Sequence, residues 1–271
     1  MTEPSAFDFG SGSVASTYDD ALVPVLFRPW AARLVAEHSR WEGHWVLDLA
    51  TGTGVVAELL AGQVGPEGKV IGTDINREML ALAQRRCADL SQVVHFVESP
   101  AHPLELSDET VDVVVCQQGF QFFPDRGAAA EEIYRVLREG GRVIVSTWRP
   151  VTECEFFGVI CMALGAIDEN EMANAMRVPF DFMPESELAT HFTSAGFENV
   201  TVKRQEQNLV LNGGVKHAIE VAYSTPIAPQ LRALPEEKQA LFRNAMRDLV
   251  DELSDDGVTM GRMISNVLTA W

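Results

Sequence analysis

The sequence predicts an α/β protein with a doubly wound, mostly parallel seven-stranded sheet, a helical lid and an antiparallel C-terminal strand. Short runs that are almost continuously apolar, such as VDVVVCQ at 111–117, are typical of parallel strands buried on both faces. These runs alternate with segments of helical spacing. That alternation is typical of βαβ units with right-handed crossovers.

The alternating elements lie between residues 45 and 148. Strands are expected at 45–50, 69–74, 93–99, 111–117 and 142–148, and helices at 30–38, 54–62, 76–90 and 125–137. Asn76 is the expected N-cap of the third helix, and Gly140 with Gly141 ends the fourth. Farther along, we expect a helix at 185–197, a strand at 198–211, helical segments over 215–253 and an antiparallel edge strand at 263–271.

The composition argues against several classes of partner and site. A formal charge of −18, from 39 acidic and 21 basic residues, repels phosphate backbones, so nucleic acid is not an expected partner. The four cysteines form no C-x-x-C pair and no zinc spacing with histidine, so we expect no metal site and reduced thiols. The N-terminal stretch lacks the pattern of a signal peptide, and no apolar run is long enough to span a membrane; both favour a cytoplasmic protein.

The segment VLDLATGTGVVAELL, 46–60, predicts a ligand-binding turn between a strand and a helix. Gly52 and Gly54 permit a tight turn and close approach of a ligand, while the helix that follows offers free N–H groups. The spacing Gly52, Gly54, Ala57 also fits the G-x-G-x-x-A turn that places a dinucleotide pyrophosphate on a helix N-terminus. Two classes of nucleotide ligand are therefore open at this point.

Asp48, at the end of the apolar strand, distinguishes the two classes. Its carboxylate would repel a pyrophosphate but attract an ammonium group, by on the order of 1–4 kcal/mol at about 4 Å depending on the dielectric. This favours a cationic nucleoside such as S-adenosylmethionine (SAM), which has an ammonium, a sulfonium and no phosphate. An alternative is that Asp48 only caps the amides of the turn.

Four segments in order resemble motifs of class I SAM-dependent methyltransferases. They are VLDLATGTG, VIGTDINREMLALA, VDVVVCQQGFQFFPD and EIYRVLREGGRVIVSTW, which together cover roughly 45–148. The similarity is to the small-molecule branch that includes the ubiquinone/menaquinone-biosynthesis methyltransferases. The resemblance implies SAM as cofactor, S-adenosylhomocysteine (SAH) as product, and methyl transfer to an O, N or C atom of a small acceptor.

The resemblance also implies which residues hold the cofactor. Asp74 would bind both ribose hydroxyls, with Ile75 and Met79 against adenine, and Tyr18 would fold over the methionine end. The full set of expected cofactor residues is Tyr18, Asp48, Ala50, Thr51, Gly52, Gly54, Asp74, Ile75, Met79, Ser99, Pro100, Ala101 and Gln117. For Asp74 the alternative is a plain cap of the next helix, and for Tyr18 a surface or core position.

One departure from the family pattern concerns adenine. The family usually has an acidic residue after the third strand, which accepts the adenine amino group, but here Pro100 stands in its place. Glu98 or Ser99 is expected to substitute, or backbone groups of Ala101 and His102 are expected to do so.

No catalytic residue is assigned from the sequence. His102, Gln118, Gln121 and His217 are weak candidates, because the transfer needs a general base only if the acceptor must lose a proton. Gln118 and Gln121 follow the fourth strand, where acceptor and sulfonium should meet. For each of these residues, the alternative is an ordinary polar side chain that is solvated or hydrogen-bonded within the protein.

We expect residues 1–271 to form a single methyltransferase domain with a SAM-binding core at 40–150. Segments 1–30, 151–180 and 213–257 are the expected lid over a moderately apolar substrate pocket, although a plain helical core would explain the same composition. A homodimer is left open. Two other functions also remain open: an NAD(P)-dependent oxidoreductase and a SAM-binding module without catalysis.

Overall fold

The computed structural model describes residues 12–38, 40–181 and 183–271, and the contacts within it divide the chain into two compact units. Unit 2 takes in Arg28–Trp148, Met183–Gln205 and Ser265–Trp271, and unit 1 takes in Met1–Phe27, Arg149–Phe182 and Glu206–Ile264, as far as these ranges are described. The single domain expected from the sequence stays a prediction.

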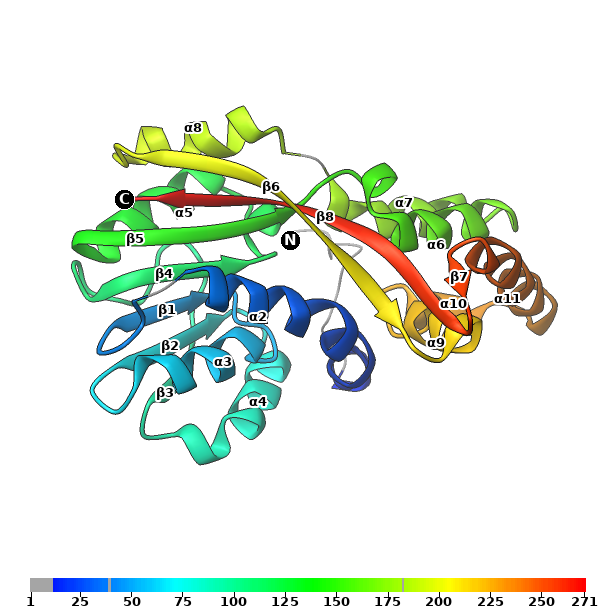
Figure 1. The fold of residues 1–271 in the computed structure, drawn as a ribbon, viewed down its shortest axis with the longest axis horizontal. Helices are drawn as coiled ribbons and strands as arrows, with labels where there is room; N and C mark the ends of the chain where they lie inside the picture. The colour runs from blue at the N-terminus through cyan, green and yellow to red at the C-terminus, as the bar shows by residue number, and fades with distance from the viewer. Residues whose placement is uncertain (1–11, 39, 182) are drawn as a thin grey trace. The chain divides into compact units, whose positions relative to one another are not determined.

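The sheet has the predicted doubly wound order (Figure 1). Its strands are β1 (Trp45–Leu49), β2 (Lys69–Asp74), β3 (Val94–Glu98), β4 (Val111–Gln117), β5 (Leu137–Trp148), β6 (Val200–Leu211) and β8 (Val258–Ala270). They follow one another as β3-β2-β1-β4-β5-β8-β6, and the short β7 (Ser254–Asp255) pairs with β8 off this path. β1 pairs in parallel with β2 and β4, β2 with β3, and β4 with β5.

The last strand is antiparallel, as predicted, but its expected position at the edge of the sheet is wrong. β8 pairs antiparallel with β5, from Val143 opposite Ala270 to Trp148 opposite Ser265, and lies between β5 and β6. Ser265 and Asn266 are both fully buried, although the alternation of residues over 263–271 favoured an edge strand. The alternation of polar and apolar residues therefore does not mark an exposed face here.

β5 also begins earlier than predicted. It starts at Leu137, immediately after the preceding helix, and its pairing with β4 shifts register between Val111 and Val113. Gly140, with φ +75°, falls within this irregularity. The glycines thus interrupt the regular pairing of the strand instead of separating it from the helix.

The helices of unit 2 lie close to their predicted ranges, except that the helix expected at 76–90 ends at Arg86. They are α2 (Arg28–Glu37), α3 (Val55–Val64), α4 (Arg77–Arg86), α5 (Arg126–Val136) and α8 (Glu185–Ala195), with short 3₁₀ turns η2 (Ala88–Leu90) and η3 (Phe120–Phe122). The Asn76 side chain accepts hydrogen bonds from the N–H groups of Glu78 and Met79, which confirms it as the N-cap of α4. Gly196, with φ +116°, ends α8.

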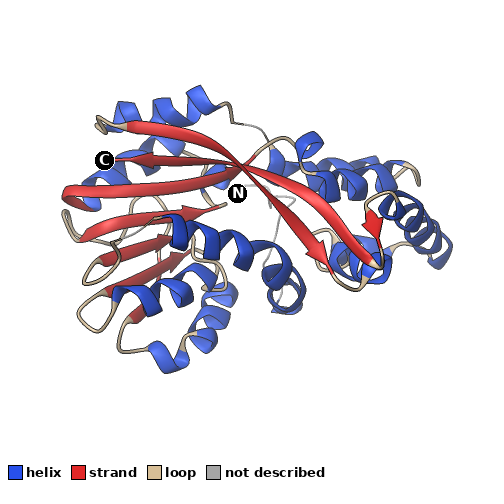
Figure 2. Ribbon diagram, viewed as in Figure 1, coloured by secondary structure: helices blue, strands red, loops and turns tan. Residues whose placement is uncertain are grey.

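Helices flank the strands of unit 2, which makes a layered α/β core (Figure 2). Residues of α5 and α8 pack with β1, β4, β5 and β8 into one hydrophobic cluster. Phe192 of α8 is fully buried in it, with its ring centroid 5.2 Å from Phe120 and 5.7 Å from Phe197. On α2, Trp30 packs edge-on against Trp148 of β5. The packed layers hold the strand ends, and with them the candidate site, in a fixed arrangement.

Unit 1 is mostly helical. Its helices are α1 (Gly12–Thr17), the π-helical η1 (Tyr18–Phe27), η4 (Val151–Glu153), α6 (Glu155–Gly165), α7 (Asn170–Arg177), η5 (Val178–Phe180), α9 (Gly214–Ala222), α10 (Ala228–Ala233) and α11 (Glu236–Asp251). It also contains β7, residues 206–211 of β6 and residues 258–264 of β8. Phe156, Phe157, Met172 and Met176 are buried within the protein, as a plain helical core would require, whereas Met162 is exposed. The lid role of these segments stays a prediction.

Among the helices in the described part of the chain, none is both long enough and apolar enough to cross a membrane.

The aromatic cluster gives a test of the fold. We expect Phe192→Ala to lower the free energy of unfolding by about 3–5 kcal/mol, because it removes a fully buried ring and leaves a cavity. Ser186→Ala, at an exposed position of the same helix, should change it by less than about 0.5 kcal/mol. Denaturant unfolding measures both, and equal effects of the two substitutions would contradict the packing described.

Candidate active site

The carboxyl ends of β1, β2 and β4 meet at one edge of the sheet in unit 2. Asp48 of β1 lies opposite Gly72 of β2 and Val115 of β4, so the residues that follow each strand are neighbours. In open α/β sheets this edge, near the reversal of strand order, is where ligands bind. The structure thus gathers the glycine turn, Asp74 and Gln117 at one edge.

The glycine turn has two glycines with different roles. Gly52 has φ +55°, and a side chain placed there would meet no atom within 4 Å, so its outer side is open space. Gly54 has φ +81° at the start of α3, and a Cβ there would lie 2.9 Å from the Cβ of Ala83. Gly52 therefore leaves room for a ligand, and Gly54 lets the turn pack directly on α4.

The Asp48 carboxylate accepts hydrogen bonds from the turn and from α3. Its Oδ2 accepts hydrogen bonds from the Thr51 hydroxyl, at 2.5 Å, and from the Ala57 N–H, at 3.0 Å. The side chain is also only 1% exposed, and the alternative of a turn-capping carboxylate fits these bonds. A direct contact of Asp48 with the cofactor stays a prediction.

Burial changes the charge that can be assigned to Asp48. Burial raises the pKa of this carboxyl to about 7, although the hydrogen bonds from Thr51 and Ala57 oppose the shift. Near neutral pH a part of the molecules therefore carries a neutral acid at this position. The attraction for an ammonium group that the sequence argument invoked is correspondingly smaller in the ligand-free protein.

Asp74 joins β2 to both the glycine turn and α4. Its Oδ2 accepts from the Gly52 N–H and its Oδ1 from the Asn76 N–H, each at 2.9 Å. Burial raises the pKa of Asp74, and the same backbone bonds oppose that shift. Each carboxylate oxygen can accept a second hydrogen bond, so ribose hydroxyls still have acceptors here.

Ile75, directly after Asp74, is 72% exposed. A large apolar side chain at the ligand edge with so little cover is suited to packing on a flat aromatic ligand. Met79, one turn into α4, is buried instead.

The loop after β3 holds the expected adenine residues. The Ser99 N–H donates to the Asp74 carbonyl at 3.1 Å, while its hydroxyl donates to the Pro100 carbonyl and accepts from the Glu105 N–H. Ser99 is therefore engaged within the loop. Pro100 and His102 are exposed and Ala101 is half-buried.

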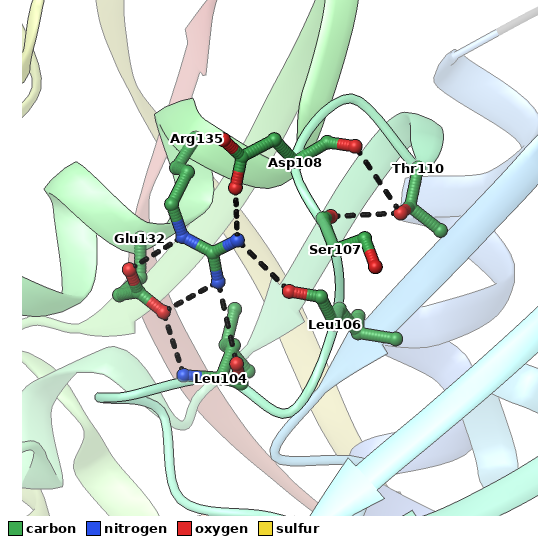
Figure 3. Close-up of polar contacts among 7 residues, drawn as sticks. All are labelled: Leu104, Leu106, Ser107, Asp108, Thr110, Glu132 and Arg135. Carbon is green, nitrogen blue, oxygen red and sulfur yellow. Dashed lines mark hydrogen bonds and ion pairs between the residues drawn. The ribbon is translucent and has the colours of Figure 1, made fainter.

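The continuation of this loop is tied to α5 by a charged cluster (Figure 3). Arg135 donates to the carbonyls of Leu104 and Leu106 and pairs with Glu132 and Asp108. Glu132 also accepts from the Leu104 N–H at 2.6 Å, and the hydrogen bond from Arg135 lowers the pKa of Glu132. Sequence reasoning missed this cluster, whose only local signal is the i,i+3 spacing of Glu132 and Arg135.

Gln118 lies just past the end of β4 with φ +56°, which is unusual for a residue with a side chain. Its Nε2 donates to the Ser265 hydroxyl at 3.1 Å, and that hydroxyl donates to the Thr147 carbonyl at 2.8 Å. Because the Ser265 proton is used in this way, the amide must present its nitrogen to Ser265. The buried Gln118 Oε1 then faces elsewhere, and no hydrogen-bond donor among the described residues reaches it.

The other candidates fall in different places. Gln121 is buried after β4, and its backbone carbonyl accepts from Arg126 at 2.7 Å. Tyr18 and His217 belong to unit 1, where the Tyr18 ring packs 5.1 Å from Phe27 and His217 lies half-buried on α9. Their roles at the site stay predictions.

The strand order, the glycine turn after β1 and the acid that ends β2 are those expected of the class I SAM-dependent methyltransferase fold. The ligand edge also fits SAM: there is open space at Gly52, an exposed apolar side chain at Ile75, and spare acceptor capacity on Asp74. In the described part of the chain, no group of three or more His, Cys, Asp or Glu side chains is arranged to hold a metal ion.

Comparisons with known proteins identify the family. A methyltransferase-domain family model matches residues 46–141. The chain is 30% identical over 224 residues to the ubiquinone/menaquinone biosynthesis C-methyltransferase UbiE of Xylella fastidiosa strain M23, covering 76% of this chain and 87% of that protein. It is 31% identical over 222 residues to UbiE of Stenotrophomonas maltophilia strain R551-3, covering 75% and 84%.

Solved structures share the fold. A methyltransferase-fold protein of Bacillus halodurans C-125 matches with TM-score 0.53 and 20% identity, over 90% of this chain and 97% of that one. The phosphoethanolamine N-methyltransferase 2 of Haemonchus contortus matches with TM-score 0.61 and 16% identity, over 96% and 57%.

The chain therefore belongs to the class I SAM-dependent methyltransferase family, and it is an enzyme that uses SAM. Family membership sets aside both the nicotinamide-dependent oxidoreductase and the SAM-binding module without catalysis.

The raised pKa of Asp48 predicts a pH dependence of stability. From about pH 4 to about pH 7 the unfolded chain releases this proton and the folded chain retains it, so the contribution of Asp48 to stability falls as pH rises. Asp48→Asn is neutral throughout. Its free energy of unfolding should therefore fall less steeply than that of the wild type in this window, by up to roughly 1.4 kcal/mol per pH unit.

Denaturant titrations at several pH values measure the two slopes. Asp89→Asn, which removes an exposed carboxylate, is the control and should keep the wild-type slope. A slope unchanged by Asp48→Asn would show that the carboxyl titrates normally.

Proposed function

We propose that this enzyme binds SAM across the ends of β2, β1 and β4 and transfers its methyl group to a moderately apolar small molecule. The observation that carries the proposal is the placement of Asp74. Its carboxylate is oriented by two backbone N–H groups from different elements and keeps acceptor capacity at the ligand edge.

The adenosine end is assigned to the β2 side of the edge. Asp74 would accept hydrogen bonds from the ribose hydroxyls, and Ile75 would cover one face of adenine with Met79 beneath. Because Pro100 has no acceptor side chain and the Ser99 hydroxyl is engaged in the loop, the adenine amino group is assigned to backbone groups around Ala101.

The amino-acid end is assigned to the turn of Ala50, Thr51, Gly52 and Gly54, beside the N-terminus of α3. Free N–H groups at a helix start favour a carboxylate, and the open side of Gly52 gives it room. Asp48 would act mainly by holding this turn, and its ionised fraction would favour the ammonium group. Gln117, at the end of β4, would contact the same part of SAM.

The acceptor is assigned to the β4 side, near Gln118 and Gln121. The Gln118 amide follows β4 and reaches Ser265 on β8, on the side of β4 that faces away from β1 and β2, and its buried Oε1 suits a donor group of the acceptor. Among O, N and C, a carbon atom is favoured, because the similar UbiE proteins are C-methyltransferases.

When bound, SAM supplies an activated methyl group, so the protein acts mainly by orientation. Alignment of acceptor and sulfonium can supply roughly 7–11 kcal/mol of the barrier. A base is required only if the acceptor must lose a proton, and His102 and His217 stay weak candidates for that role. A cytoplasmic location and a homodimer also stay predictions; the four buried free cysteines are consistent with a reducing compartment.

We expect Asp74→Ala to weaken SAM binding at least tenfold, a change of about 1.4 kcal/mol, because the ribose loses its acceptor and Gly52 loses its support. Titration calorimetry with SAM measures the affinity, and thermal unfolding confirms that the variant is folded. Asp89→Ala, at an exposed position beyond α4, is the matched control and should bind as the wild type does. A folded Asp74→Ala protein with wild-type affinity would refute the assignment.

A further inference from the structure

Three consecutive residues of the glycine turn are each held by a different side chain. Asp48 of β1 accepts a hydrogen bond from the Thr51 hydroxyl, and Asp74 of β2 accepts one from the Gly52 N–H. The third residue, Thr53, is held through its carbonyl, which accepts a hydrogen bond from Arg86 Nε at 2.8 Å. The two acids belong to the motifs that the sequence revealed, whereas Arg86 belongs to none of them.

Arg86 is itself fixed in position. It ends α4, its side chain is only 16% exposed, and its NH1 group donates to Glu58 Oε2 of α3 at 3.2 Å. Glu58 also pairs with Arg28 of α2. The guanidinium therefore joins two helices and the turn, with its fork of donors divided between a carboxylate and a backbone carbonyl.

The rest of α4 supports the same segment. Ala83 lies three residues before Arg86 on the same helix face, and it touches the turn where Gly54 has no side chain. The backbone here is left-handed at Ala50, Gly52 and Gly54, with φ +58°, +55° and +81°. Gly52 and Gly54 adopt it without strain, but at Ala50, which has a side chain, it persists only where its surroundings impose it.

We propose that Arg86 is a positioning residue for SAM: by holding the Thr53 carbonyl, it keeps the amides of the turn and of the α3 N-terminus aimed at the amino-acid end of the cofactor. It does so without touching the cofactor. The inference rests on the proposed function, because it concerns the same turn, and it identifies a residue for that function outside every motif.

The test compares Arg86→Met with Arg85→Met. Arg85 is the exposed neighbour on the same helix, so the control makes the same change in charge and leaves the turn untouched. Calorimetry is run with SAH and with adenosine, which lacks the amino-acid end. For Arg86→Met we expect about tenfold weaker SAH binding and adenosine binding within about twofold of wild type. Arg85→Met should leave both within about twofold.

A second measurement follows the turn in the ligand-free protein. The Gly54 N–H donates to the Thr51 carbonyl across the turn, and its hydrogen exchange should be about tenfold faster in Arg86→Met than in Arg85→Met. If Arg86→Met does not fold, Arg86→Gln, which keeps a polar side chain, is compared in the same two assays.

The outcomes separate this inference from the proposed function. Equal loss of SAH and adenosine affinity would mean a general structural role, and no loss of SAH affinity would mean no role; either result overturns the inference. If the wild-type protein binds no SAH, the proposed function fails first and the role in binding fails with it, while hydrogen exchange still shows whether Arg86 holds the turn.

Discussion

A left-handed backbone turn held by two largely buried carboxylates is the feature on which the ligand edge depends. Asp48 and Asp74 come from adjacent parallel strands, and each bonds to a different part of the segment between β1 and α3. A short turn of this kind has no secondary structure of its own to define it. The hydrogen bonds to the two carboxylates fix the conformation of the turn. They can do so because the parallel sheet brings the ends of β1 and β2 side by side.

Much of this arrangement could be predicted from the sequence, because it is encoded locally. The apolar runs predicted the parallel strands, Asn76 predicted the start of α4, and Gly52 and Gly54 predicted where the turn lies. Asp74 was expected at the end of the second strand, but its bond to the Gly52 N–H was not. These features depend on periodicity, on helix capping and on the conformational freedom of glycine, which are properties of a few neighbouring residues.

Other features could not be read in this way, because they depend on contacts between distant residues. The contacts of Arg86 with Thr53 and of Arg135 with Leu104 exist only in the folded structure. In the sequence, both arginines look like solvent-exposed residues of a helix. The elevated pKa of Asp48 is a consequence of burial, which the sequence does not state. The position of β8 inside the sheet could not be predicted, because Ser265 and Asn266 are polar residues that are nevertheless buried.

At the switch point of the sheet, the ends of β1 and β4 meet through their smallest residues. A Cβ added to Gly119 would lie 2.6 Å from the Cβ of Ala50, closer than two carbon atoms can pack. The same Cβ would lie 3.0 Å from the Cys116 Sγ, so the space beside Gly119 is bounded by both side chains. Ala50→Gly would remove the closer of the two contacts that Gly119→Ala creates, so the effects of the two changes on stability are expected to be non-additive. The residue that position 119 accepts therefore depends on the residue at position 50, although the two positions lie after different strands.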